Sequence, residues 1–278
     1  MSIEIPEAAA SLASFLVTLP TQRTLEFFTD ILLNSSDILT SIFLGNIYMA
    51  RRPENAPRIS LNKLCEFMTA SIPRQRRIIR DQKFPSDFMR VYYREAQEAV
   101  ASCIASELED IASVERQIDI LNQQAPETVG TQRRLASNVD ALEGFLTMLD
   151  EINLAGATPS LGAIDAPKLV MRNVSVSVRP EIILRSENRN GPIIGAMKIH
   201  FPKTNPLNEQ AAGYVSAMLQ EWAQIHMQEE GEANGPLCSV VDVGSQSFFE
   251  GVRSTRQRLR DLQDACETIA ALWPTISQ

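Results

Sequence analysis

The sequence has little of what several function classes require. Aromatic residues make up only 6% of its 278 residues, and it holds 12 glycines and 15 prolines, values that exclude fibrous and linker-like chains. Its two histidines, His200 and His226, lie far apart, which argues against a zinc site and against Ser-His or Cys-His catalysis. The phosphate-loop, nucleophile-elbow and H-E-x-x-H motifs are all missing from the sequence.

Cysteine usage and the lack of long apolar runs both point to a cytoplasmic chain. The four cysteines form no C-x-x-C pair, so we expect them to be small buried hydrophobes in a reducing compartment. No run approaches the roughly 20 apolar residues of a membrane span. The N-terminus, Met1 to Glu7, is acidic where a secretory signal would carry Lys or Arg. We therefore expect a cytoplasmic protein without a membrane partner.

The composition is otherwise that of a globular protein, with 44% hydrophobic and 22% charged residues and a net charge of −8. The basic residues are unevenly placed, because residues 51–100 hold 11 Lys or Arg against 6 Asp or Glu. Such a cluster can neutralise phosphates, or it can be a solvated helix face paired with nearby acids. The residues we expect to contact nucleic acid are Arg74, Arg76, Arg77, Arg80 and Lys83. A second cluster consists of Arg253, Arg256, Arg258 and Arg260.

The hydrophobic pattern predicts helices through residues 1–130. Apolar residues recur at helical spacing, and breaks fall at prolines and at Asn34. Ser60 is a candidate N-cap, Pro73 begins an Arg-rich helix, and Pro85 begins a longer helix that runs to about Asp119 or Asn122. The three most N-terminal helices are predicted at 8–19, 22–33 and 36–50. This region forms the first predicted domain, all-helical.

The pattern changes in residues 131–278, the second predicted domain. A helix at 131–153 and a loop at 155–162 precede several β-branched runs. Those runs are 168–172, 174–178, 181–185 and 193–201, with a hairpin turn at 188–191. A helix at 207–228, a buried strand at 237–243 and a helix from Ser254 or Thr255 to Leu272 complete the chain. The predicted fold is α+β or α/β, a mixed sheet with helices on both faces.

Three fragments of this second domain carry a pattern of chemical interest. Glu181 follows Pro180 at the start of a strand, Lys198 ends the sequence Gly-Ala-Met-Lys in the next strand, and Gln210 and Tyr214 lie in the helix after it. These fragments resemble the PD-(D/E)xK nuclease superfamily, whose core has the order α-β-β-β-α-β, and the last resembles the QxxxY element of its RecB-like branch. The resemblance covers roughly residues 131–250 and implies a restriction-endonuclease-like core.

The resemblance implies a catalytic site for phosphodiester hydrolysis in DNA or RNA. Mg²⁺ or Mn²⁺ would polarise the phosphate, with Glu181 as ligand and Lys198 as the charge stabiliser or water activator. Gln210 and Tyr214, one helical turn apart, would contact phosphate at the same sheet edge. Where the superfamily has its second acid, this sequence has Ala196. Glu209 on the following helix and Glu143 on the preceding helix would then complete the metal site.

Other interpretations remain open at this stage. Glu181 and Glu209 are compatible with surface acids, Tyr214 with core packing, and His200 with either assistance to Lys198 or a structural role. Ala196 favours a catalytically inactive nuclease fold that binds nucleic acid or a protein, against an active endo- or exonuclease. A third hypothesis makes the helical half an interaction module that meets a protein partner or a second copy of the chain.

Overall fold

A mixed β-sheet lies between two layers of helices in the computed structural model, which describes residues 56–85 and 92–277. Its strands run in the order β2-β5-β6-β8-β9, with the short β7 paired beside β6. β2, β5 and β6 are antiparallel, β8 is parallel to β6, and β9 is antiparallel to β8. The strands are β2 (Thr158–Leu161), β5 (Ile182–Asn188), β6 (Gly191–His200), β7 (Glu232–Ala233), β8 (Ser239–Asp242) and β9 (Ser247–Phe249).

The central strand β6 is buried on both faces from Ile194 to His200. Its alternating side chains enter two separate apolar cores, Ala196 on one side and Met197 on the other. Gly195 is needed here, because a Cβ at this position would lie only 2.4 Å from the carbonyl oxygen of Leu237. β6 therefore fixes the position of both helical layers.

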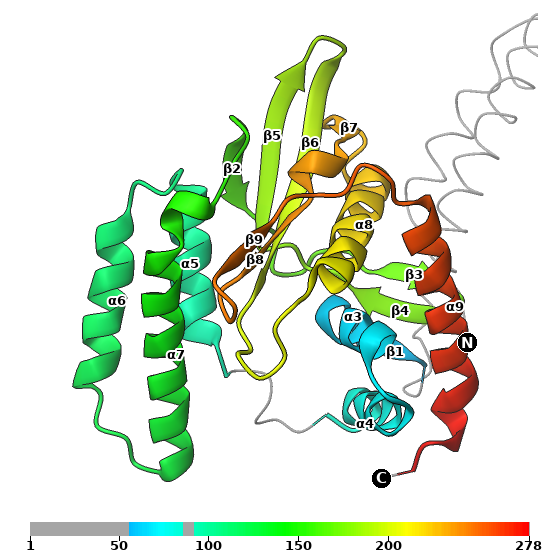
Figure 1. Ribbon diagram of the computed structural model, residues 1–278, viewed down its shortest axis with the longest axis horizontal. Coiled ribbons are helices and arrows are strands. Elements are labelled where there is room, and N and C mark those ends of the chain that lie inside the picture. The colour runs from blue at the N-terminus through cyan, green and yellow to red at the C-terminus, as the bar shows by residue number, and fades with distance from the viewer. Residues whose placement is uncertain (1–55, 86–91, 278) are drawn as a thin grey trace, which may run out of the picture. The chain divides into compact units, whose positions relative to one another are not determined.

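Three helices cover one face of the sheet, on the left of Figure 1. They are α5 (Arg94–Ala105), α6 (Ile111–Gln123) and α7 (Val129–Thr147), followed by a 3₁₀ turn at Leu149–Glu151. Buried Asn138 of α7 joins this layer to α5, accepting a hydrogen bond from the Ala96 amide at 2.9 Å and donating to the Tyr92 carbonyl at 2.7 Å.

The other face is covered by helices from both ends of the described chain. They are α3 (Leu61–Thr69), α4 (Ile72–Lys83), α8 (Glu209–His226) and α9 (Arg256–Leu272). α8 is also the crossover between the parallel strands β6 and β8. Two 3₁₀ turns, Gly235–Leu237 and Trp273–Thr275, close the connections after α8 and α9.

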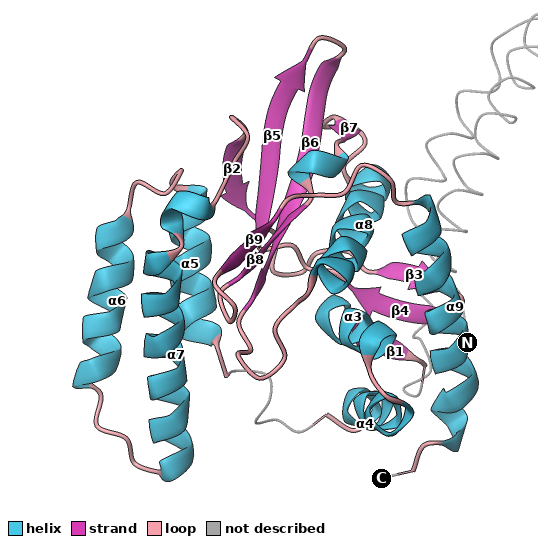
Figure 2. Ribbon diagram, viewed as in Figure 1, coloured by secondary structure: helices cyan, strands magenta, loops and turns pink. Residues whose placement is uncertain are grey.

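A small second sheet packs into the same core as α8, and Figure 2 shows its strands apart from the main sheet. Its order is β1-β4-β3, with β1 parallel to β4 and β3 antiparallel to β4. The strands are β1 (Arg58–Ser60), β3 (Leu169–Met171) and β4 (Val174–Ser177).

The structure confirms a mixed α/β fold. The strands predicted at 168–172 and 174–178 are present as β3 and β4, but they belong to the small second sheet and lie between β2 and β5 in the sequence. One assignment was wrong, because the predicted loop at 155–162 contains the edge strand β2. β2 shows no apolar alternation and contains Pro159, which is tolerated at a sheet edge. The hairpin between β5 and β6 is confirmed, with Asn188 opposite Gly191.

Two predictions in the helical region also need correction. The long helix predicted from Pro85 is interrupted after α5, where Glu107 and Leu108 adopt φ of 60° and 66° and the Leu108 amide donates to the Cys103 carbonyl. Neither residue is Gly or Pro, and the available signal was Asp110, which caps α6 by accepting from the Ser113 amide at 3.2 Å. Arg58–Ser60, in the segment predicted as wholly helical, forms β1. The predicted helices at 8–19, 22–33 and 36–50 lie outside the described residues.

Helices on both sides of residue 130 pack against the same sheet, and Asn55–Gln278 form one compact unit. The four cysteines are buried and unpaired, as predicted from their spacing: Cys65, Cys103, Cys238 and Cys266. None of the helices in the described parts combines the length and hydrophobicity needed to cross a bilayer.

Replacing Asn138 with Ala should lower the free energy of unfolding by about 2 kcal/mol, because the Ala96 amide and Tyr92 carbonyl lose their partner in a buried setting. Urea denaturation measures this loss. Gln132→Ala, on the exposed side of the same helix, is the control and should change stability by less than about 0.5 kcal/mol. Equal midpoints for the two variants would contradict the assigned role of Asn138.

Candidate functional site

Glu181 and Lys198 meet at the end of the β5–β6 ladder. The register pairs Ile182 with Met197, and the Glu181 amide donates to the Met197 carbonyl at 3.1 Å, so Glu181 lies opposite Lys198. Their side chains project to the same side of the sheet, and Lys198 Nζ lies 2.7 Å from Glu181 Oε1. The convergence expected from strand alternation is therefore present.

Both groups of this ion pair are enclosed and fully partnered. The exposed fractions of the side chains are 10% for Lys198 and 7% for Glu181. Glu181 Oε1 also accepts from Gln97 Nε2 on α5 at 2.7 Å, and Oε2 accepts from the Ile199 amide at 2.9 Å. Lys198 Nζ also donates to the Arg179 carbonyl at 2.7 Å. A buried pair is tolerated when its remaining hydrogen-bonding capacity is satisfied in this way.

The residues around Glu181 do not fit a magnesium ion. Mg²⁺ takes carboxylate oxygens and retained waters, whereas Ala196 is fully buried and offers no oxygen. Glu143 is exposed on α7, and Glu209 is exposed in the first turn of α8. Within the described residues no three His, Cys, Asp or Glu side chains form a group able to hold a metal. Glu143, Glu181 and Glu209 are thus not part of such a group in the described residues.

Gln210 and Tyr214 interact with each other and with α9. Tyr214 is 7% exposed, and its hydroxyl donates to Asp261 Oδ2 at 3.1 Å. Burial raises the pKa of Tyr214 above its usual value, a hydrogen bond with Gln210 opposes that shift, and the Asp261 carboxylate adds to it. The Tyr214 hydroxyl thus takes part in a contact between α8 and α9. From the sequence, we expected it to contact phosphate at the sheet edge.

His200 lies two residues beyond Lys198 on the same face of β6. Its Nε2 contacts the Asn205 carbonyl at 2.9 Å, while the buried Nδ1 has no partner among the described residues. Burial lowers the pKa of this histidine, although the Asn205 carbonyl and the nearby Asp242 carboxylate oppose the shift. The ring is therefore held neutral in a structural position.

Asp242 is a buried residue at this end of the sheet that sequence analysis missed. It lies opposite His200 on β8, has no exposed surface, and accepts from the Leu207 amide at 2.7 Å and the Ser245 amide at 3.3 Å. It holds together the loops before α8 and after β8. The available signal was an acid that ends an otherwise apolar strand.

The predicted nucleic-acid contacts divide into two groups. Arg74 donates through Nε to Glu66 at 2.7 Å, and Lys83 donates to the carbonyls of Trp273 and Ile276 at 2.7 and 2.8 Å, so both have structural roles. Arg76, Arg77 and Arg80 are exposed on α4. Among the described residues Arg80 approaches Asp81 only at 3.9 Å.

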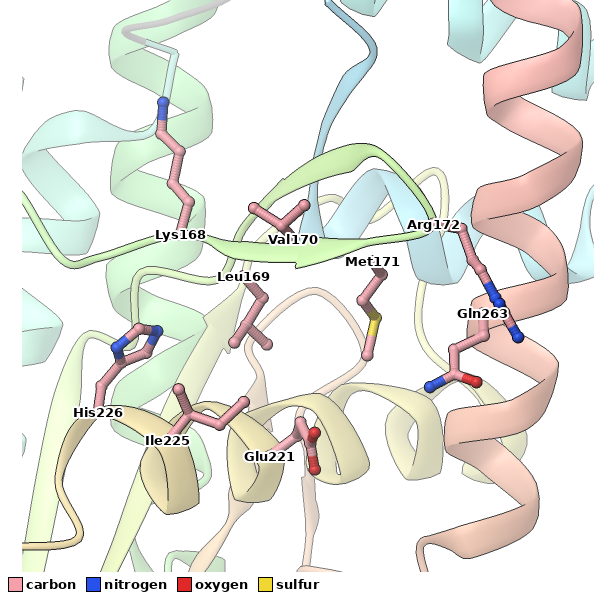
Figure 3. Close-up of a pocket in the computed structure, with 9 residues that line it drawn as sticks. All are labelled: Lys168, Leu169, Val170, Met171, Arg172, Glu221, Ile225, His226 and Gln263. Carbon is pink, nitrogen blue, oxygen red and sulfur yellow. The ribbon is translucent and has the colours of Figure 1, made fainter. Parts of the chain in front are cut away.

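Two cavities lie on either side of the small sheet. One, of about 750 Å³, lies between that sheet and α4 and contains Arg58, Arg77 and Ser175 in its lining. The other, of about 530 Å³, lies between β3, α8 and α9. Figure 3 shows Leu169 and Met171 pointing from β3 toward α8 across this smaller space, so its centre is apolar.

No protein-family model matches the chain, and no curated protein matches it either.

Breaking the Glu181–Lys198 pair should strongly destabilise the fold. Lys198→Met leaves a buried carboxylate without its counter-charge and should cost roughly 3–5 kcal/mol of unfolding free energy. In the double variant with Glu181→Gln the total cost should be below the sum of the single costs by about 2 kcal/mol. Chemical denaturation of all three proteins measures this coupling.

The exposed Arg185–Glu230 pair supplies the control, because its side chains are 44% and 46% exposed. Arg185→Met should cost less than about 1 kcal/mol. A strictly additive double variant of Glu181 and Lys198 would refute their energetic coupling.

His200 should make the fold less stable in mild acid. Its folded pKa is below the ordinary value of 6.5, so the unfolded chain binds the proton more readily. The contribution of neutral His200 to the free energy of unfolding is complete above pH 6.5 and is lost as the pH falls below that value. Urea midpoints at pH 7.5 and 5.5 should therefore differ less in His200→Asn than in the unmodified protein. His226→Asn, at a more exposed histidine whose pKa burial also lowers, should remove a smaller part of the difference.

Proposed function

We propose that this chain binds nucleic acid on the exposed side of α4 without hydrolysing it, and that Glu181 and Lys198 serve as a structural ion pair. The observation that carries the proposal is the engagement of Glu181, whose two oxygens accept from Lys198, Gln97 and the Ile199 amide. A carboxylate with these three donors has little capacity left for a cation. The neighbouring position that would add an acid is Ala196.

Hydrolysis would also need a free positive group beside the reacting phosphate. The Lys198 ammonium is 2.7 Å from both the Glu181 carboxylate and the Arg179 carbonyl, and its side chain is only 10% exposed. A phosphate could reach it only if these contacts were broken. The pair is therefore better suited to closing the end of the sheet than to catalysis.

The charge distribution supports binding at α4. The chain as a whole carries −8, which repels a polyanion from most of its surface. Arg76, Arg77 and Arg80 lie exposed on one short helix and approach no carboxylate in the described residues closer than 3.9 Å. Arg76 and Arg77 have no ion-pair partner among the described residues and can bind phosphates directly, whereas Arg80 would exchange its contact with the neighbouring Asp81.

A second candidate function, a metal-dependent nuclease, is favoured by one observation. Glu181 and Lys198 occupy neighbouring strands on one side of the sheet, as the resemblance to PD-(D/E)xK nucleases implies. The two candidates differ in whether strands are cut, so one set of assays separates them.

The purified full chain should bind single-stranded and duplex DNA and RNA in a salt-dependent manner, without cleaving them in Mg²⁺ or Mn²⁺. Replacing Arg76, Arg77 and Arg80 with Ser should reduce the log–log salt slope by about 0.9 per lost duplex phosphate contact, or about 0.7 for single strands. Fluorescence anisotropy from 50 to 300 mM salt measures the slope.

The matched control replaces Arg253, Arg256 and Arg260, three exposed arginines near or on α9, with Ser. It makes the same change in net charge and should leave the slope unaltered. Equal slopes in both triple variants would remove α4 as the binding surface. Cleavage that disappears in Glu181→Gln would instead favour the nuclease.

A further inference from the structure

The larger cavity has a polar floor formed by one face of the small sheet. Arg58 on β1, Ser175 on β4 and Val170 on β3 are register partners, so their side chains share this face. The opposite face carries Ile59 and Val176, which belong to the apolar core. α4 lies over the polar face, and the partly open space there measures about 750 Å³.

Ser175 is the most buried polar side chain in the lining of this cavity. It is 6% exposed, and its Oγ has no hydrogen-bond partner within the described residues. Leaving a buried hydroxyl unpaired costs roughly 1–3 kcal/mol, so such groups are normally satisfied by protein, water or ligand. Because Ser175 lines the cavity, a group that enters it can supply the missing partner.

Three cations of the lining are available to a ligand. Arg58, Arg77 and Lys168 have no ion-pair partner among the described residues. Figure 3 shows the Lys168 side chain pointing away from α8, the side opposite to Leu169 and Met171. Free cations around an unpaired hydroxyl donor are the groups that bind phosphate oxygens.

The other two cations of the lining, Lys63 and Arg74, are both paired with the single carboxylate of Glu66. Burial alone would raise the pKa of Glu66, but the hydrogen bonds from these two residues outweigh it and hold the pKa below its usual value. Glu66 therefore stays charged and offsets one of the two positive charges. With Asp81 as the acid of the lining, the cavity still has a net positive charge.

The cavity is larger than a phosphate group needs. A volume of about 750 Å³ is in the range of pockets that hold drug-sized ligands. The Phe84 side chain also lines it and is 37% exposed, and because Lys83 Nζ lies over the ring at 5.5 Å from its centroid, part of the ring remains open to contact. Nucleic-acid bases stack on such rings, which contributes about 1–3 kcal/mol per base. Phosphate and base can thus be held together.

We infer that this cavity receives the phosphorylated terminal nucleotide of a nucleic-acid strand, with the phosphate near Ser175 Oγ, Arg58 and Arg77 and the base near Phe84. The inference rests on the proposed function and adds to it the part of the strand that is recognised. Arg77 belongs to both surfaces, so a strand held in the cavity continues along Arg76 and Arg80 on α4.

A terminal phosphate fits this floor better than an internal one. A phosphomonoester carries about −1.5 to −2 charges at pH 7 and three free oxygens, against one charge and two free oxygens for a phosphodiester. An internal phosphate also brings a nucleoside on each side, whereas Ser175 is only 6% exposed. A group that enters end-first can reach the hydroxyl with one nucleoside behind it.

The test compares 12-nucleotide strands, labelled at the far end, that carry a phosphate or a hydroxyl at the 5′ or the 3′ end. The full chain should bind one of the phosphorylated strands about tenfold more tightly than its unphosphorylated form. Ser175→Ala and Arg58→Gln should each reduce this ratio to about twofold. Arg172→Gln, on the smaller cavity, is the control and should keep the full ratio.

Ser175→Ala also separates ligand binding from folding. Removing an unpaired buried hydroxyl should leave the unfolding midpoint unchanged or raise it, whereas a hydroxyl with a structural role would lower it. Loss of stability together with loss of the ratio would overturn the inference.

The remaining outcomes distinguish this inference from the proposed function. Equal affinity for phosphorylated and unphosphorylated strands overturns the inference alone. Absence of binding to every strand overturns both. Tight binding of a nucleoside monophosphate that does not compete with the phosphorylated strand places the strand end elsewhere and also overturns the inference, as does preferential binding of a phosphoserine peptide.

Discussion

The burial of β6 on both faces is the constraint on which the rest of the structure depends. A strand whose side chains enter two apolar cores can contain a lysine only if the ammonium group is neutralised and hydrogen-bonded. Lys198 donates to the Glu181 carboxylate, which neutralises it, and to the Arg179 carbonyl. Gln97 and the Ile199 amide donate to the Glu181 carboxylate. The pair thus joins β5 and β6 to α5. The Glu181–Lys198 pattern, which is associated with catalysis, here has the geometry of a structural ion pair.

The sequence was informative where local rules govern the structure. Strand alternation and an Asn–Gly turn sufficed to place Glu181 opposite Lys198, because the hairpin register follows from the turn. Propensity failed where tertiary contacts dominate. β2 consists of Thr158–Leu161, which shows no alternation and becomes a strand by pairing with β5. The break near Leu108 has no Gly or Pro, and its one local signal is the Asp110 cap of α6.

The roles of the charged residues were harder to predict, since each is set by a distant partner. Gln97 reaches Glu181 across 84 positions of the sequence, and Lys83 reaches the Trp273 carbonyl across 190. The basic run therefore reads as uniform in the sequence, although the structure assigns Arg74 to Glu66 and leaves Arg77 exposed beside a cavity. The composition reveals a basic segment. Only the coordinates show which of its cations are paired within the protein and which are free to bind a ligand.

This separation bears on what the molecule can do with a phosphate. Binding needs donors that are free, whereas hydrolysis needs a cation site and a general base held close to the reacting bond. At the end of β6 the charged groups already satisfy each other, and the position beside them is Ala196. At the small sheet Arg58 has no ion-pair partner and Ser175 Oγ has no hydrogen-bond partner among the described residues, and both line a partly open cavity. The charged groups at the end of β6 thus leave little capacity for phosphate, whereas those at the small sheet remain available, and this contrast is what supports the proposal of binding over hydrolysis.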